Sequence, residues 1–310
     1  MPALEDKYVI NAEYTGISLA YTNTDYIADK VLPRVPVSKQ VFTYDEYPAE
    51  AFLNVPKTLI GPKGEPESMD IKKERKAVSV EYYALKDEVP QTDIDEQGEG
   101  EDIMGDNVLL LTEGLALARE ARVSKMLQNT ANYGTNTVTL SGTDVLSNKE
   151  SSLLDTIFDA RAKMLVKPNK MIVSDDGAIY LQRHPDVVSM FKAQYSDQKS
   201  GIAPLEYVAQ LLKMDEIIVG KTIMNAAKKG QNANLVQAWG NDLIMIYQNP
   251  LAKPKQGMTF GYTAQWGTRQ VGQYFDPEPG YSGVHKNKVA EALVEVIAAK
   301  SCGFLIKNAF

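Results

Sequence analysis

The sequence predicts an α+β protein, and three observations support that class. Segments rich in β-branched and aromatic residues, which favour strands, occur at residues 77–85 and 289–298. Apolar residues at helical spacing predict a long helix over residues 107–131. Residues 150–250 then mix short helices with short strands, which indicates an α+β lobe.

Residues 1–37 are expected to form an N-terminal arm rather than a domain. Pro33 and Pro36 push the residues that precede them out of the helical region and into extended geometry. Four apolar side chains here have too little local sequence to bury them, namely Val31, Leu32, Val35 and Val37. They must lie on another surface, either the chain's own core or that of a neighbouring molecule. An ordinary edge strand within one domain is the simpler alternative.

Residues 38–92 contain two strand-like segments, at 41–45 and 77–85. Between them, residues 61–67 carry glycine and proline without any hydrophobic period. A connection of this length is uncommon inside a compact domain unless it has a function. The segment is therefore interpreted as a projecting β-hairpin with a mobile tip.

An acidic linker at residues 93–106 precedes the long helix, and Asp102 and Asp106 are candidates for the N-terminal cap. One helical face carries Val108, Leu111, Leu115 and Ala118. At about 1.5 Å per residue, the helix spans more than roughly 30 Å, the width of a small domain. It is expected to act as a spine.

A second helix is expected to begin near Ser152, where Ser152 and Asp155 have the spacing of a capping box. Short helices are then predicted at residues 178–183, 185–193 and 204–212, and strands at 171–174, 217–219 and 243–247. Near the C-terminus, one alternating apolar face is formed by Ala290, Ala292, Val294, Val296 and Ala298. A helix fits the spacing of residues 291–296 nearly as well, but the β-branched content favours a strand.

Residues that commonly carry catalysis are scarce. His184 and His285 are the two histidines and lie far apart in the sequence, and Cys302 is the one cysteine. None of the motifs G-x-S-x-G, H-E-x-x-H or C-x-x-C occurs. The sequence therefore predicts no enzyme, no metal site and no cofactor.

Two segments resemble ligand-binding motifs but lack an essential residue. Gly220 is followed by Lys-Thr, as at the end of a phosphate-binding loop, but Asp215 occupies the position of that loop's first glycine. Residues 93–98 resemble the start of a calcium loop, but its twelfth position, which needs a bidentate glutamate, is Met104. An acidic linker that leads into a helix N-terminus is the simpler interpretation.

Composition argues against further classes. The net charge is −7 and the basic residues form no run, whereas a sequence-independent DNA-binding protein needs a basic face. No segment approaches the roughly 18–20 apolar residues of a membrane helix, and the N-terminus lacks the pattern of a signal peptide. A single cysteine excludes an internal disulfide and fits synthesis in a reducing compartment.

The order of these elements resembles the major capsid proteins of tailed bacteriophages, which have the Hong Kong 97-type fold. Tyr-Ile-Ala-Asp-Lys-Val-Leu-Pro at residues 26–33 and Val-Pro-Val at 35–37 resemble the N-terminal arm of one such family. Leu-Ala-Arg-Glu-Ala-Arg-Val at 117–123 is similar to its spine helix. Further matches are residues 39–52 to the extended loop, and 215–230, 239–242, 257–266 and 302–308 to the axial domain and closing strands.

The resemblance implies the domain organisation. Residues 1–37 would be the N-terminal arm and residues 38–92 the extended loop, a β-hairpin. Residues 93–149 and 265–310 would form the peripheral domain with the spine helix at 107–131, and residues 150–264 the axial domain. The implied function is that of a structural virion protein, a subunit that self-assembles into hexamers and pentamers of an icosahedral shell around the phage genome.

The same resemblance implies partners and a location. The subunit would assemble in the host cytoplasm, end in the virion capsid and enclose DNA without sequence-specific binding. Some relatives carry an N-terminal scaffolding segment, whereas the matching arm here begins almost at Met1. A separate scaffolding protein and a portal are therefore expected, and a decoration protein and a covalent crosslink between subunits stay open.

Assembly is expected to use many modest contacts, in which the arm and the hairpin cover apolar surface on neighbours. The contact candidates are Val31, Leu32, Val35, Val37, Phe42, Tyr44, Val80, Tyr82 and Tyr83. Deleting residues 1–37 is expected to abolish shells while leaving a folded subunit. Two alternatives remain, an encapsulin-type nanocompartment shell with the same fold and a small-molecule-binding enzyme that uses residues 150–264.

Overall fold

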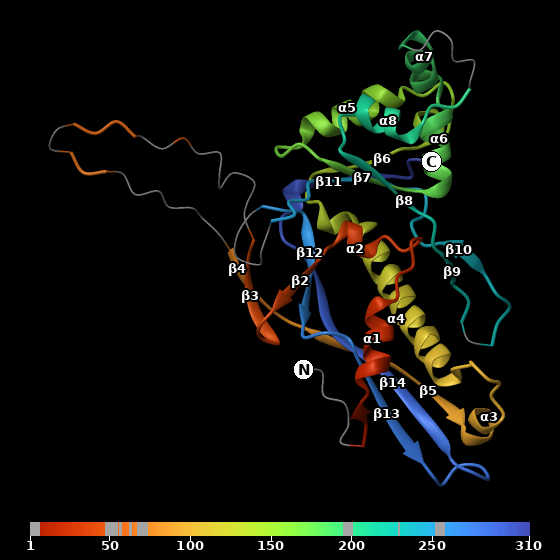
Figure 1. Cartoon of the computed structure of the whole chain (residues 1–310). Coiled ribbons are helices and arrows are strands. Elements are labelled where there is room, and N and C mark those ends of the chain that lie inside the picture. Colours follow the sequence, from red (N-terminus) through yellow and green to blue (C-terminus); the bar gives the residue numbers. More distant parts are fainter. Residues whose placement is uncertain are drawn as a thin grey trace.

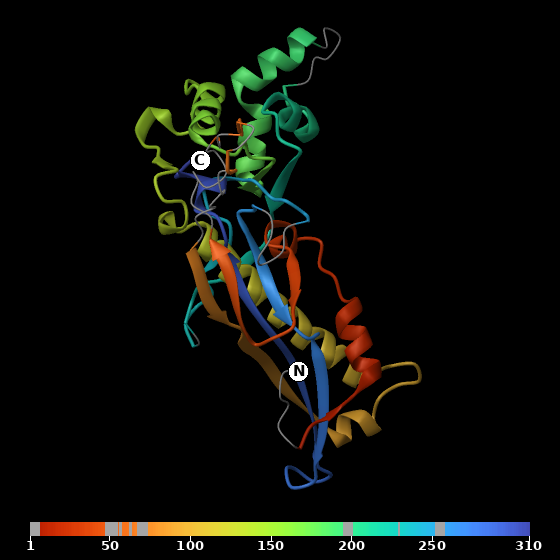
Figure 2. The same cartoon turned by 90° about the vertical axis from the view of Figure 1, so that its left-hand side faces the viewer.

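The computed structural model describes residues 7–46, 55, 58–61, 64–66, 74–194, 201–228, 230–251 and 258–310. The elements form two lobes along the long axis of the molecule (Figure 1). A six-stranded sheet and the longest described helix make the first lobe (Figure 2). A five-stranded sheet with short helices makes the second lobe, which is the upper lobe in Figure 1. The α+β class is confirmed.

The large sheet is built around one long strand, β14 (Val284–Ile297). Strand β5 (Glu81–Pro90) pairs along one side of β14, and β12 (Gly261–Trp266) and β13 (Gln270–Asp276) follow one another along the other side. The edge is completed by β1 (Val9–Ile10) on β13 and β2 (Arg34–Val37) on β12. The strand predicted at residues 289–298 is therefore confirmed, and its helical alternative is wrong.

The predicted spine is helix α4 (Ile103–Leu127), which begins and ends four residues earlier than predicted. The earlier start follows from its cap, because the Asp102 carboxylate accepts a hydrogen bond from the Gly105 amide at 2.9 Å. The helix packs on the large sheet through an apolar cluster formed by Val108, Leu111, Leu115, Val271 and Val289. Short helix α3 (Gln91–Asp95) lies between β5 and α4.

The second lobe has the sheet order β6-β15-β11-β7-β8. Its strands are β6 (Thr137–Thr139), β15 (Gly303–Lys307), β11 (Leu243–Ile246), β7 (Lys170–Ser174) and β8 (Glu216–Gly220). Helices α5 (Leu153–Lys163), α6 (Asp175–Arg183), α7 (Pro185–Gln194) and α8 (Leu205–Leu211) accompany it. The short helices and strands predicted between residues 171 and 247 are confirmed within a few residues. The capping box at the start of α5 is wrong, because the Ser152 side chain makes no capping hydrogen bond.

The sheets divide the chain differently from the expected domain ranges. Strand β12 runs across the expected boundary at residues 264 and 265 and lies wholly in the large sheet. Strands β6 and β15, from ranges assigned to the peripheral domain, complete the sheet of the other lobe. Sheet pairing joins segments that are distant in sequence, which a division into consecutive ranges does not capture.

Residues 7–37 are less extended than expected. They contain helix α1 (Ala12–Ala20), which starts at the Asn11 cap, and helix α2 (Ala28–Val31). The strands of this stretch are the short β1 and β2. Strand β2 lies at the edge of the large sheet, parallel to β12. The edge-strand alternative for residues 31–37 thus describes the pairing correctly.

The predicted hairpin starts with β3 (Val41–Glu46) and β4 (Glu74–Ser79), which pair antiparallel from Val41 opposite Ser79 to Glu46 opposite Glu74. The strand predicted over residues 77–85 is divided at Val80, after which β5 joins the large sheet. Of the residues predicted to form a mobile tip, 62, 63 and 67 lie outside the described residues, and the mobility of the tip stays a prediction.

A second small hairpin, β9 (Ile223–Asn225) and β10 (Leu235–Gln237), leaves the upper lobe beside α4 and was not predicted. Single 3₁₀ turns occur at η1 (Thr130–Asn132), η2 (Gly142–Asp144) and η3 (Lys300–Cys302). Among the described helices, none combines the length and the apolar character needed to cross a membrane.

Candidate subunit-contact surfaces

The N-terminal segment is fastened to the spine helix by a buried carboxylate. Glu120 on α4 is fully buried and accepts hydrogen bonds from the Ile27 amide at 3.0 Å and the Ala28 amide at 2.8 Å. The same carboxylate accepts a third bond from the indole Nε1 of Trp239 at 2.7 Å. Burial raises the pKa of the Glu120 carboxyl, and the three donors and Arg119 oppose that rise without reversing it. One side chain thereby joins the arm, the spine and the upper lobe.

An ion-pair network lies next to this carboxylate. Asp29, just after the start of α2, pairs with Arg119 at 2.7 Å and with Arg34 at 2.8 Å. Glu291 on β14 pairs with Arg34 at 3.1 Å and with Arg269 at 3.2 Å. Burial raises the pKa of Asp29, but the charges of Arg119 and Arg34 outweigh it and hold that pKa below its ordinary value. The network fixes β2 and α2 against the sheet and the spine.

Val31 and Leu32 are wrong as inter-subunit contact candidates. Both side chains have no exposed surface and lie in a core cluster with Ile27, Leu127 and Trp239 of the same chain. Because of this burial, removal of residues 1–37 is now expected to unfold the subunit rather than to leave it folded. The apolar sequence that pointed to a neighbour is covered by the spine helix and the second lobe of the same chain.

The remaining candidates are divided between the chain's own sheet and the solvent. Side chains of Val35, Val37, Phe42 and Tyr44 are partly buried against an apolar cluster on the large sheet that contains Val296. Val80, where the hairpin enters the sheet, is buried. These residues hold the base of the hairpin on its own sheet and offer a neighbour only part of their surface.

Tyr82 and Tyr83 point to opposite faces of β5. Tyr82 is 55% exposed and remains available to a neighbour. Tyr83 lies under the guanidinium of Arg122, whose carbon is 3.6 Å from the ring centroid. Burial, together with a hydrogen bond to Glu81, raises the pKa of the Tyr83 phenol.

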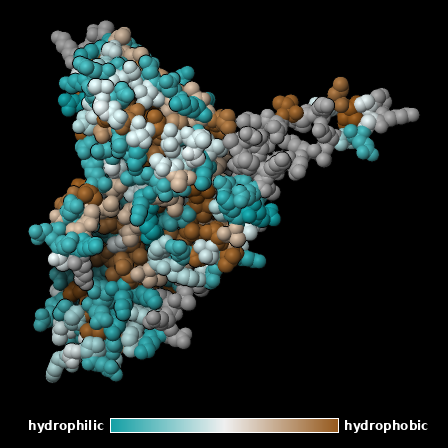
Figure 3. Space-filling model, turned by 180° about the vertical axis from the view of Figure 1, so that it is seen from behind, coloured by the Kyte–Doolittle hydropathy of each residue, from teal (hydrophilic) through white to brown (hydrophobic). Residues whose placement is uncertain are grey.

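Several exposed apolar side chains are not among the contact candidates named from the sequence. Val41, Leu110, Ile223, Leu235 and Tyr281 each expose 60% or more of their surface. From behind, apolar side chains are spread mainly over the middle of the molecule rather than at its ends (Figure 3). Single exposed apolar side chains are common at protein surfaces, whereas contiguous apolar patches mark contact sites. The sequence gives no alternating signal for β9 (Ile-Met-Asn) or β10 (Leu-Val-Gln), which are three residues each.

A comparison with known proteins gives a decisive match. The chain is 37% identical over 303 residues to the major capsid protein of Pseudomonas phage JBD67, and the match covers 97% of each chain. The chain belongs to the family of bacteriophage major capsid proteins. A second relative, the major capsid protein of Burkholderia phage BcepMu, is 24% identical over 273 residues, and the match covers 85% of each chain. No model of a protein family matches the sequence.

Solved structures agree on the fold of this capsid protein. A phage-related protein from Bordetella bronchiseptica superimposes with a TM-score of 0.77 at 21% identity, covering 97% of this chain and 98% of the other. The capsid of cyanophage P-SCSP1u gives a TM-score of 0.57 at 10% identity, covering 89% and 86%. A virus-like particle from Pyrococcus furiosus gives 0.56 at 14% identity, covering 96% and 99%. The Hong Kong 97-type fold is confirmed.

The function expected from the sequence is confirmed, because the relatives are phage major capsid proteins. The chain is a structural capsid subunit of the virion that self-assembles into a shell. The comparisons do not favour an encapsulin-type compartment. Among the described residues, no cluster of histidine, cysteine, aspartate and glutamate could hold a metal ion.

The segment Gly220-Lys221-Thr222, which resembles the end of a phosphate-binding loop, has a packing role in the capsid protein. Gly220 ends β8, and a Cβ atom added there would lie 2.1 Å from Cδ1 of Trp239. The Thr222 side chain is buried and donates a hydrogen bond to the Asp25 carbonyl at 3.1 Å. The glycine therefore allows the buried indole to approach the strand, and the threonine fastens the loop before α2.

Replacing Gly220 with alanine is expected to lower the free energy of unfolding by about 1–3 kcal/mol, because the new methyl group overpacks the Trp239 site. Urea unfolding followed by tryptophan fluorescence measures the change. Gly16 on α1 is the matched control, since a Cβ atom there meets nothing within 4 Å. Its replacement by alanine is expected to leave stability unchanged or slightly raised. Equal effects at both positions would contradict the packing role.

Proposed function

We propose that the subunit forms the hexamers and pentamers of an icosahedral shell by extending its hairpin over neighbouring subunits. The lobe with the large sheet and α4 would be the peripheral domain, the other lobe the axial domain, and β3 and β4 the base of the extended loop. The observation that carries the proposal is apolar surface between these two strands in sequence. Val55 and Leu59 expose 93% and 97% of their surface, and a neighbouring subunit would cover them.

Among the described residues of the hairpin, those at its base pack on the chain's own large sheet. Phe42, Tyr44 and Val78 pack on the apolar cluster of the large sheet, and the pairing described for β3 and β4 ends at Glu46 opposite Glu74. Apolar side chains beyond that pair would gain burial energy by contact with another subunit, at about 25 cal/mol per Å². Summed over a closed shell, such modest contacts give a stable particle.

The test replaces residues 47–73 with Asn-Gly. Because Glu46 and Glu74 are directly opposite, a two-residue type I′ turn closes the shortened hairpin. The shortened subunit is expected to fold with an unchanged melting temperature but to form no closed particles in electron micrographs, whereas the natural chain forms them. A control with Val55 and Leu59 replaced by serine keeps the loop length and is expected to reduce the yield of particles. Normal shells from the shortened subunit would refute the proposal.

We further propose that the subunit has no catalytic role and that it is assembled in the host cytoplasm with a portal and a separate scaffolding protein. The phage capsid relatives, which are structural proteins, support this assignment. The formal charge of −7 favours a wall that encloses DNA without binding to it strongly. Affinity capture of the subunit from infected cells, with the portal and scaffold identified by mass spectrometry, tests these partners.

A further inference from the structure

Two neighbouring cross-strand pairs between β5 and β14 in the large sheet differ in charge, because one pairs a lysine with a glutamate and the other pairs two lysines. On the face away from α4, Lys286 of β14 lies opposite Glu88 of β5 and forms ion pairs with Glu88 at 3.4 Å and Asp276 at 2.8 Å. The next rung on the same face places Lys288 directly opposite Lys86. Like charges in directly opposed positions destabilise a sheet. Neither lysine has a carboxylate partner among the described residues.

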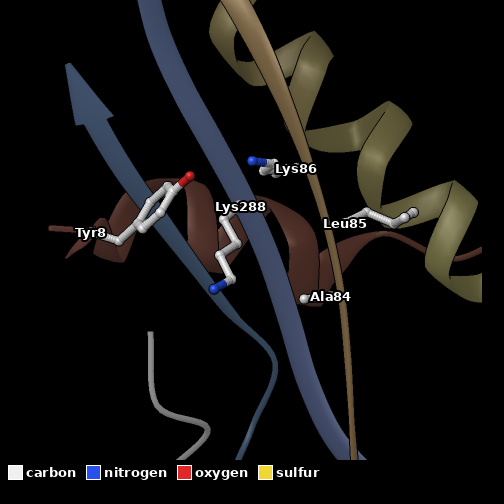
Figure 4. A pocket seen from close by; sticks show the side chains of 5 residues that line it. All are labelled: Tyr8, Ala84, Leu85, Lys86 and Lys288. Carbon is white, nitrogen blue, oxygen red and sulfur yellow. The ribbon is translucent and has the colours of Figure 1, made fainter. Parts of the chain in front are cut away.

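The two lysines line a shallow, half-open pocket of about 270 Å³ together with Tyr8, Ala84 and Leu85 (Figure 4). The Lys288 ammonium lies 5.3 Å from the centroid of the Tyr8 ring. Figure 4 shows Leu85 extending toward α4, while Tyr8 and the lysines lie on the other side of the strands. The pocket thus has two cations and an aromatic wall, which is the chemistry of a carboxylate site.

An acidic turn of the same chain has the complementary chemistry. Between residues 91 and 106 there are seven acidic residues and no lysine or arginine. Most of these carboxylates are exposed, and several already accept hydrogen bonds within the turn, as Asp102 does from Gly105. The side chains of Glu96 and Glu99 have no hydrogen-bond or ion-pair partner in the described part of the chain. Glu99 lies between two glycines at the exposed tip.

The two patches lie on opposite sides of the large sheet. The acidic turn leads directly into α4, and α4 packs on the face that carries Val289, whereas Lys288 points to the other face. The basic patch on one side of the sheet and the acidic turn on the other suit a head-to-tail contact between two copies of the chain. Such a contact closes into a ring when it is repeated by rotation.

We propose that the Lys86–Lys288 pocket receives the acidic turn of a second copy of this chain, with Glu96 and Glu99 as the paired carboxylates. The inference rests on the proposed self-assembly. DNA phosphate is the less favoured occupant, because a pocket of about 270 Å³ matches a side chain better than a duplex.

The test is a charge swap. One variant carries Lys86→Glu and Lys288→Glu, a second carries Glu96→Lys and Glu99→Lys, and a third combines all four changes. The particle fraction is measured by sedimentation over a series of subunit concentrations. Each double variant is expected to raise the concentration needed for assembly about tenfold or more, and the fourfold variant to recover most of the loss. Lys149→Glu with Lys192→Glu, at exposed positions on other elements, is the matched control and is expected to assemble normally.

The outcomes separate the inference from the function on which it rests. If the natural chain forms no particles, the proposed self-assembly fails. If the natural chain and both double variants assemble equally, only the inference is overturned. The absence of rescue in the fourfold variant also overturns it, and weaker binding of a DNA duplex by the lysine variant alone would then assign the pocket to phosphate. Melting curves for each variant, and the neutral pair Lys86→Gln and Lys288→Gln, separate lost contact from lost folding.

Discussion

Replacing Glu120 with alanine is expected to lower the free energy of unfolding by about 3–5 kcal/mol, because three buried donors lose their acceptor. The amides of Ile27 and Ala28 and the indole of Trp239 would remain buried without a partner. The truncation also leaves a space between α4 and the arm. For a chain of this size the melting temperature should fall by about 5–10 °C. Calorimetry of the purified subunit measures it directly.

Two controls separate the lost hydrogen bonds from a general effect of mutation. Glu120→Gln keeps one acceptor oxygen and nearly the same volume, so it is expected to lie between the natural chain and Glu120→Ala. Glu150→Ala removes an exposed carboxylate and should change stability by less than about 0.5 kcal/mol. If Glu120→Gln and Glu120→Ala are equally mild, the buried carboxylate does not hold the arm.

The role of Glu120 could not be derived from its position in the sequence. Its helix was predicted from apolar spacing, and that spacing says nothing about which polar residue faces inward. The three donors come from residues 27, 28 and 239, so the site exists only after the arm and the upper lobe meet on α4. The one local signal is an Arg119-Glu120 pair beside an otherwise apolar face.

Local patterns were sufficient where a segment decides its own structure. The short elements that were predicted between residues 171 and 247 each have a cap, a proline or a β-branched run of their own, whereas β9 and β10 in the same range were missed. Helix α1 was missed because Gly16 and Thr15 weaken its helical pattern. The division of residues 77–85 at Val80 depends on two different partners, β3 and β14, which no local pattern contains.

The contact candidates show the same limit. An apolar segment beside prolines has the same sequence pattern whether its side chains pack on the subunit's own core or on a neighbouring subunit. Val31 and Leu32 proved to be core, whereas Tyr82 on β5 stays open to solvent. The Lys86–Lys288 rung depends on the register between β5 and β14, and that register is fixed by tertiary pairing.

Deleting residues 1–37 is expected to unfold the subunit rather than to produce a folded subunit that fails to assemble. Ile27, Val31 and Leu32 are almost wholly buried, and each contributes about 1.5–3 kcal/mol by burial. Their combined loss, about 5–9 kcal/mol, is comparable with the entire stability of a typical protein, about 5–15 kcal/mol. Circular dichroism and urea unfolding of the truncated chain are expected to show no cooperative transition.

A shorter deletion separates folding from assembly. Removing residues 1–10 takes away β1, whose Val9 is 74% exposed, but keeps the Asn11 cap of α1 and all of α2. This chain is expected to unfold cooperatively, with a loss below about 2 kcal/mol. A cooperative transition in the chain that lacks residues 1–37 would instead show that the second lobe stays folded without the arm. Because the arm belongs to the subunit core first, absence of shells after the long deletion says nothing about contacts between subunits. Only the short deletion tests those contacts.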